Sequence, residues 1–174
     1  WRAGDELSTA MTGDGREAPS EAFLLTGKGS HYAGIAFEFS RAHAGVRATL
    51  DECAALFAPF LERPLLDVLK PGSPDARLLE RMSYAQPALF AVEMALARMW
   101  MDAGVRPAAV LGHSLGEISA ACVAGVLDIE DAVRLVAHRG RLMEATPAGA
   151  MAVVFADATV VAPLLRPDGP TVAG

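Results

Sequence analysis

The stretch Val110-Leu111-Gly112-His113-Ser114-Leu115-Gly116-Glu117 decides the fold, because a short apolar run ends there in a serine between two glycines. A Gly-x-Ser-x-Gly pattern that follows a strand and opens a helix is typical of a nucleophile elbow, in which the serine lies on a strained turn. The flanking residues must be small, since larger side chains would clash across the turn. We therefore predict a strand before Ser114, a helix after it, and an outward-facing hydroxyl group that carries the chemistry.

The residues after Ser114 are expected to form a site for negative charge. The first N–H groups of a helix lack partners within the helix and carry partial positive charge. The backbone N–H of Leu115 would therefore suit an oxyanion that develops during attack by the serine. Strand, turn and helix would supply the nucleophile and the anion site together.

A second unit of strand and glycine loop lies near the start of the chain. Residues 21–26 form a short apolar run, which Gly27-Lys28-Gly29-Ser30 ends. If both strands belong to one parallel sheet, both loops lie at its carboxyl edge, where open α/β folds bind ligands. Alternatively, Gly27 and Gly29 only turn the chain.

The remaining periodicity is mainly helical. Apolar residues recur three or four positions apart, for example at Val46, Leu50, Cys53 and Phe57, and Asp128 is placed to cap a helix. Strands alternating with helices predict an α/β fold with a parallel sheet. The predicted helices cover residues 37–60, 65–69, 86–100 with Pro87 in the first turn, 115–124 and 129–145.

The two ends of the sequence are expected to differ from this core. Residues 1–20 show little periodicity and read as the end of a linker. After Pro147 we predict a strand over residues 150–155, a short helix over 159–165 and the start of another strand at Thr171. The chain is therefore expected to be part of a longer protein.

Composition excludes several classes of protein. The net charge of −6 over 174 residues gives no reason to expect nucleic-acid binding, which needs clustered Lys and Arg. No uncharged apolar run approaches the roughly 18 residues of a membrane span, and no signal peptide is recognisable, so we expect a cytoplasmic protein. Cys53 and Cys122 are expected to be free thiols, and no metal site is expected.

A general base for Ser114 is harder to find. His113 adjoins the serine on a sharp turn, where neighbouring side chains seldom point at each other, and His43 lies in an early packing helix. On the predicted helix over 129–145, Arg139 lies beside the apolar stripe and can reach a cleft, whereas His138 faces water. The base is therefore expected beyond Gly174, with His31 as the substitute within the chain.

Four motifs together resemble the acyltransferase domain of type I polyketide synthases and the related malonyl-CoA:acyl carrier protein transacylases. The resemblance extends over residues 23–174. The motifs are Gly27-Lys28-Gly29-Ser30-His31-Tyr32-Ala33-Gly34, Tyr84-Ala85-Gln86-Pro87-Ala88-Leu89-Phe90, Gly112-His113-Ser114-Leu115-Gly116-Glu117 and Arg139-Gly140-Arg141-Leu142-Met143.

The resemblance implies a function. Ser114 would take a malonyl-type group from coenzyme A as an ester and pass it to the phosphopantetheine thiol of an acyl carrier protein, in polyketide or fatty acid biosynthesis. Arg139 matches the arginine that pairs with the malonyl carboxylate, while Gln86 and His113 match residues that line the substrate site. The residue after the serine is Leu115 rather than glutamine, and in this the sequence resembles the malonyl-selecting members of the family. No bound cofactor is implied.

The resemblance also implies an architecture and partners. Residues 21–146 would form the first part of a large, hydrolase-like subdomain, and residues 147–174 would begin a small ferredoxin-like subdomain that is incomplete here. Flanking synthase domains such as a ketosynthase would accompany the acyl carrier protein. The histidine base and a later specificity motif would follow Gly174, so that the chain alone would be inactive.

One residue departs from the family pattern. Lys28 stands where the family usually has glutamine, at the position whose backbone N–H completes the oxyanion hole together with Leu115. The amide survives this change, whereas the side chain brings a cation to the site. Two alternatives stay open: a serine hydrolase of the α/β type, and a degenerate acyltransferase-like scaffold without catalysis.

Overall fold

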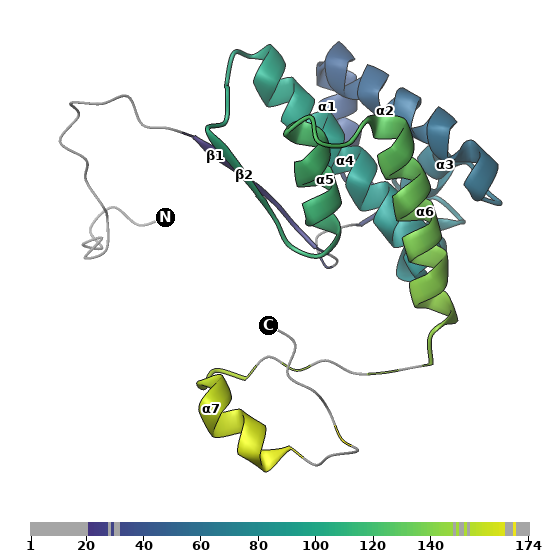
Figure 1. The fold of residues 1–174 in the computed structure, drawn as a ribbon. Helices are drawn as coiled ribbons and strands as arrows, with labels where there is room; N and C mark the ends of the chain where they lie inside the picture. The colour runs from purple at the N-terminus through teal and green to yellow at the C-terminus, as the bar shows by residue number, and fades with distance from the viewer. Residues whose placement is uncertain are drawn as a thin grey trace, which may run out of the picture.

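The structure, a computed structural model, describes residues 21–27, 29, 32–147, 149, 152, 154–165 and 169. Its sheet has two strands, β1 (Ala22–Leu25) and β2 (Ala109–Gly112), which pair in parallel with Leu25 opposite Gly112. The two strands predicted before the glycine loop and before Ser114 are confirmed. Because the strands are parallel, the loops that follow Leu25 and Gly112 leave the same edge of the sheet (Figure 1).

Helices make up most of the described chain. The α-helices are α1 (Phe37–Ala42), α2 (Ala44–Phe57), α3 (Leu65–Leu69), α4 (Met82–Asp102), α5 (Leu115–Val123), α6 (Ile129–Ala145) and α7 (Ala158–Val161). Three short 3-10 helices follow α2, α3 and α7: η1 (Ala58–Phe60), η2 (Ala76–Glu80) and η3 (Ala162–Leu164).

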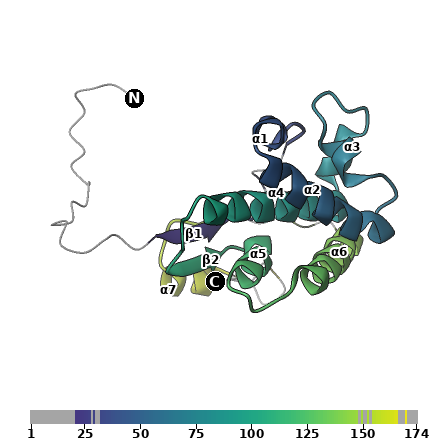
Figure 2. The ribbon, with the colours of Figure 1, turned by 90° about the horizontal axis from the view of Figure 1, so that it is seen from above.

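Helix α4 is the centre of the core. Figure 2 shows it between α1, α2 and α3 on one side and β2, α5 and α6 on the other. Every residue from 84 to 95 is buried, as expected of a helix that other elements surround. The predicted stripe on α2 packs in the same core, since Val46, Leu50, Cys53 and Phe57 are all buried.

Two predicted helix boundaries are wrong. The helix predicted over 37–60 is broken at His43, where the backbone is extended (φ −127°, ψ 111°). This residue ends α1 and precedes α2, so the segment forms two separate helices. Pro87 is not in the first turn of its helix, because α4 already begins at Met82. Pro87 has no N–H, so the carbonyl of Ser83 loses its bond within the helix.

The chain after α6 is less regular than predicted. Ala152, Val154 and Phe155, the described members of the strand predicted over 150–155, lie in neither helix nor strand, and Phe155 is 99% exposed. No described strand lies beside them to supply hydrogen-bond partners. The short helix predicted over 159–165 is confirmed by α7 and η3, while the strand predicted from Thr171 lies outside the described residues.

The two cysteines are free thiols, as predicted. Burial raises the pKa of Cys53 to about 12, and that of half-buried Cys122 to about 11. Within the described ranges, no helix is long and apolar enough to cross a membrane. The same ranges contain no group of three or more His, Cys, Asp or Glu side chains that could hold a metal ion.

Candidate active site

Ser114 lies between β2 and α5 in a strained backbone conformation. Its φ of 58° and ψ of −110° lie in a region that residues with a side chain rarely adopt, and it directly precedes the first residue of α5. Such strain persists only where the surrounding structure holds it, and it is common at functional sites. The predicted order of strand, strained serine and helix is therefore present.

The two glycines around Ser114 are required by close backbone packing. A Cβ atom on Gly112 would lie 2.2 Å from the backbone of Gly116 and Glu117. A Cβ atom on Gly116 would lie 2.3 Å from the carbonyl oxygen of Leu25, at the end of β1. The predicted need for small residues around the turn is confirmed, and the glycines also allow α5 to start directly against both strands.

Replacing Gly116 with alanine is expected to destabilise the fold. The added methyl group meets backbone rather than a flexible side chain, so α5 and β1 must separate, and we expect a loss of about 2–3 kcal/mol in unfolding free energy. Urea denaturation measures this. Gly45→Ala in α2 is the matched control, because its Cβ would lie 3.4 Å from the Asp102 carboxylate. Similar losses in both variants would contradict the packing argument.

The backbone N–H of Leu115 is the first of α5. The N–H groups of the next two residues are used, since Gly116 donates to the carbonyl of His113 (3.0 Å) and Glu117 donates to that of Ser114 (3.2 Å). Within the described part of the chain, the Leu115 N–H meets no acceptor. The first N–H groups of a helix commonly lack a partner within the helix, and this one follows Ser114 directly.

Arg139 connects the serine with the predicted substrate-site glutamine. One guanidinium nitrogen (Nη2) donates to Ser114 Oγ at 2.9 Å, and the other (Nη1) donates to Gln86 Oε1 at 2.6 Å. The Gln86 amide in turn donates to the sulfur of Met143 at 3.1 Å. The three predicted residues Ser114, Arg139 and Gln86 line one small pocket, whose other lining residues are Met82, Ala85, Leu89, Leu115 and Met143.

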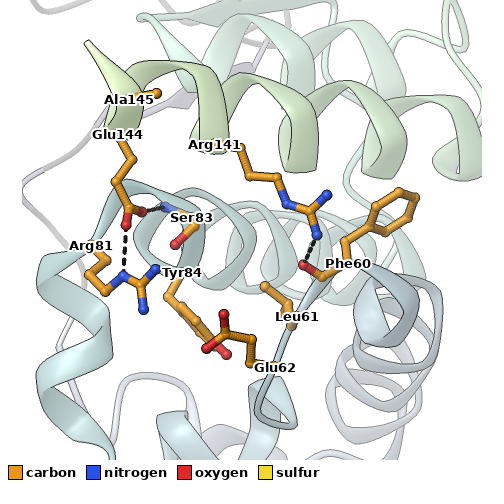
Figure 3. Close-up of a pocket in the computed structure, with 9 residues that line it drawn as sticks. All are labelled: Phe60, Leu61, Glu62, Arg81, Ser83, Tyr84, Arg141, Glu144 and Ala145. Carbon is orange, nitrogen blue, oxygen red and sulfur yellow. Dashed lines mark hydrogen bonds and ion pairs between the residues drawn. The ribbon is translucent and has the colours of Figure 1, made fainter.

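Helix α6 is fixed against the first turn of α4, which places Arg139 beside Gln86. A Cβ atom on Gly140 would lie 2.7 Å from the carbonyl oxygen of Met82, so the helices touch there. Glu144 extends this contact: it accepts from the Ser83 N–H at 3.0 Å and pairs with Arg81 at 2.8 Å (Figure 3). The next residues on α6 therefore hold Arg139 in position.

The Glu144 contact is expected to make this packing sensitive to acid. Hydrogen bonding by Ser83, followed by hydrogen bonding by Arg81, lowers the pKa of Glu144 below its usual value. A carboxyl group whose pKa is lower in the folded state stabilises the fold above its unfolded pKa, and this contribution is lost as the pH falls through the folded value. Glu144→Gln should cost less than about 1 kcal/mol at pH 7, because the side chains are partly exposed, and this cost should be smaller at pH 3. Urea denaturation at both pH values measures this difference, and a cost that is independent of pH would contradict the assignment.

The described histidines do not contact the serine hydroxyl. The backbone N–H of His113 donates to the Leu25 carbonyl (3.0 Å), and the His113 ring packs over Gly27. His43 stacks on Phe39, and exposed His138 packs edge-on against Phe60, as its predicted orientation toward water allows. Lys28 and His31, the predicted amide donor and the substitute base, lie outside the described residues.

One polar residue of the core was missed in the sequence. Glu93 lies in the middle of α4, is 8% exposed, and accepts hydrogen bonds from residues of β1's end and of α5. An acidic residue within an otherwise apolar run, Ala91-Val92-Glu93-Met94-Ala95, was the available signal.

Comparison with known proteins identifies the family to which the sequence is similar. The model of the family described as "Acyl transferase domain" matches residues 22–174. The PKS-NRPS hybrid synthetase acdB of Aspergillus candidus is 49% identical over 146 residues, which are 82% of this chain and 6% of that protein. This chain therefore spans a small part of the length of that relative.

Solved structures agree with the family match. The acyl transferase domain of ZmaA superposes with a TM-score of 0.73 at 40% identity, over 78% of this chain and 32% of that one. A malonyl-transacylase in complex with its type II PKS acyl-carrier protein (PlMCAT:AntF) superposes with a TM-score of 0.65 at 34% identity, over 74% of this chain and 40% of that one. With these likenesses and a family match that covers most of its length, the chain belongs to the acyl transferase domain family.

Proposed function

We propose that this chain contributes the nucleophile and the carboxylate-binding arginine of an acyltransferase that moves a malonyl-type group from coenzyme A to an acyl carrier protein. The observation that carries the proposal is the contact between the Arg139 guanidinium and Ser114 Oγ at 2.9 Å. An acyl group esterified to Ser114 would place a terminal carboxylate within reach of this cation. A planar guanidinium can bind such a carboxylate through two parallel hydrogen bonds.

The reaction consists of two transfers. Ser114 Oγ loses its proton to a base and attacks the thioester carbonyl, the C–S bond breaks, and coenzyme A leaves as the thiol with a proton. The phosphopantetheine thiol then loses its proton to the base and attacks the ester carbonyl. The C–O bond to Ser114 breaks, the serine oxygen takes up a proton, and the acyl group is left as a thioester on the carrier. In each step the carbonyl oxygen becomes negative, and the N–H groups of Leu115 and, we propose, Lys28 bind it. In this proposal the strained serine is a nucleophile elbow.

The base and the partner are also proposed rather than observed. Since no described histidine is hydrogen-bonded to the Ser114 hydroxyl, we propose that the base comes from residues outside the described ranges. An acyl carrier protein is proposed as the acceptor because a similar malonyl-transacylase is known in complex with one. A synthase with further domains, such as a ketosynthase, is the proposed setting, since the similar hybrid synthetase is much longer than this chain.

Mass spectrometry tests the function directly. The full-length protein, incubated with malonyl-CoA, should acquire a malonyl ester on Ser114, and an added acyl carrier protein should remove it with formation of malonyl thioester. Rapid release of free malonate, with no acylation of the carrier, would contradict the proposal and favour a serine hydrolase. No acylation at all would favour a scaffold without catalysis.

A further inference from the structure

Glu93 is a buried carboxylate with three neutral hydrogen-bond donors. Its Oε1 accepts from the backbone N–H of Thr26 at 2.7 Å and from the Thr26 hydroxyl at 3.1 Å, and its Oε2 accepts from the Ser119 hydroxyl at 2.6 Å. Ser119 is fully buried and Glu93 nearly so. A carboxylate is costly to bury when its partners carry no positive charge, so this residue is not explained by core packing.

The partners of Glu93 belong to the two segments that meet at the candidate active site. Thr26 follows β1 and directly precedes the first glycine loop, whereas Ser119 lies in α5, five residues after Ser114. Glu93 reaches both from α4, which packs beside α5 in the core. One carboxyl group therefore fixes the end of β1 and the first turns of α5 relative to each other.

The separation of these two segments matters for the proposed chemistry. Of the two N–H groups proposed to bind the oxyanion, that of Leu115 starts α5 and that of Lys28 follows Thr26 by two residues. An oxyanion hole works only when its donors lie about 2.7–3.1 Å from the position of the oxygen in the transition state. A displacement of about 1 Å costs on the order of 10²-fold in rate.

We propose that Glu93 is a positioning residue, which holds the end of β1 and the start of α5 at the separation that the proposed oxyanion site requires. This inference rests on the proposed function, because it assigns a role within the same acyl transfer. Hydrogen-bonding ability and size, rather than negative charge, are what the role needs. Burial raises the pKa of Glu93, and the bonds from Ser119 and Thr26 oppose this effect, which agrees with that requirement.

Two substitutions in the full-length protein separate this role from others. Glu93→Gln keeps an acceptor for the Thr26 N–H, and its amide can donate to the Ser119 hydroxyl oxygen. We expect it to retain acylation of Ser114 by malonyl-CoA within about fivefold. Glu93→Ala removes every bond, and we expect kcat for acylation to fall about 10²-fold while KM changes less than about threefold, since the contacts of Arg139 are untouched.

A control variant and a second probe keep the test decisive. Val92→Ala removes buried volume from the adjacent position of α4. The valine side chain makes no hydrogen bond to Thr26 or Ser119, so this variant should lower the melting temperature and leave kcat unchanged. A fluorophosphonate probe, which reacts with activated serines through the same oxyanion site, should label Ser114 about 10²-fold more slowly in Glu93→Ala than in the wild type.

The outcomes distinguish the two proposals. If the wild type is labelled by the probe but takes no malonyl group, the proposed function is wrong, and the labelling rates of the Glu93 variants still decide the role of Glu93. Labelling and acylation at wild-type rates in Glu93→Ala would overturn the positioning role alone. So would equal losses in Glu93→Gln and Glu93→Ala, or a similar loss of kcat in Val92→Ala.

Discussion

Replacing Ser114 with alanine is expected to abolish the malonyl adduct and to lower the rate of malonyl transfer by at least about 10⁴-fold. The hydroxyl oxygen is the atom that would form the ester, and no other described hydroxyl group contacts Arg139. Intact-protein mass spectrometry after incubation with malonyl-CoA measures the adduct, and transfer to a carrier protein measures the rate.

The same variant should still bind malonyl-CoA. Arg139 keeps its bond to Gln86 when the serine oxygen is removed, so the proposed carboxylate site remains, and the dissociation constant should change less than about fivefold. Ser40→Ala, which removes a hydroxyl group that bonds to Phe37 within α1, is the control and should acylate normally. An adduct that persists in Ser114→Ala would show that another residue is the nucleophile.

The parts of this fold that depend on neighbours in sequence could be predicted. Both strands, the cap at Asp128 and the glycines around Ser114 follow from local backbone chemistry. The place of Arg139 beside the apolar stripe of its helix followed from helical geometry, and the structure has it half-buried, with its side chain reaching Ser114.

The parts that depend on distant contacts could not be predicted. Helical periodicity continues across His43, so the break between α1 and α2 left no signal. The first turn of α4 donates to Glu144, 61 residues beyond Ser83, and the proline at the sixth position of the helix concealed where the helix begins. The partners of Glu93 lie on β1's end and on α5, and only the packed structure brings them together.

Arg139 gives the sharpest test of the substrate class, because malonyl and acetyl groups differ by one carboxylate. If the guanidinium binds that carboxylate, Arg139→Ala removes a charge-assisted pair from a half-buried site, a loss of about 3–4 kcal/mol. We therefore expect kcat/KM for malonyl transfer to fall by about 10²–10³-fold and that for acetyl transfer to change less than about fivefold. Arg139→Lys should lie between the wild type and the alanine variant, since lysine keeps the charge but not the planar pair of donors.

The ratio of the two rates is the measurement that matters. Gln86 loses a partner in Arg139→Ala, so part of the protein could unfold, and this would lower both rates equally. The ratio of malonyl to acetyl transfer is independent of the folded fraction and reports only on the carboxylate. Arg134→Ala, which removes an exposed guanidinium from the same helix, should leave this ratio unchanged. Equal losses for both acyl groups in Arg139→Ala would mean that Arg139 holds the pocket together through Gln86 and Ser114 rather than selecting the substrate.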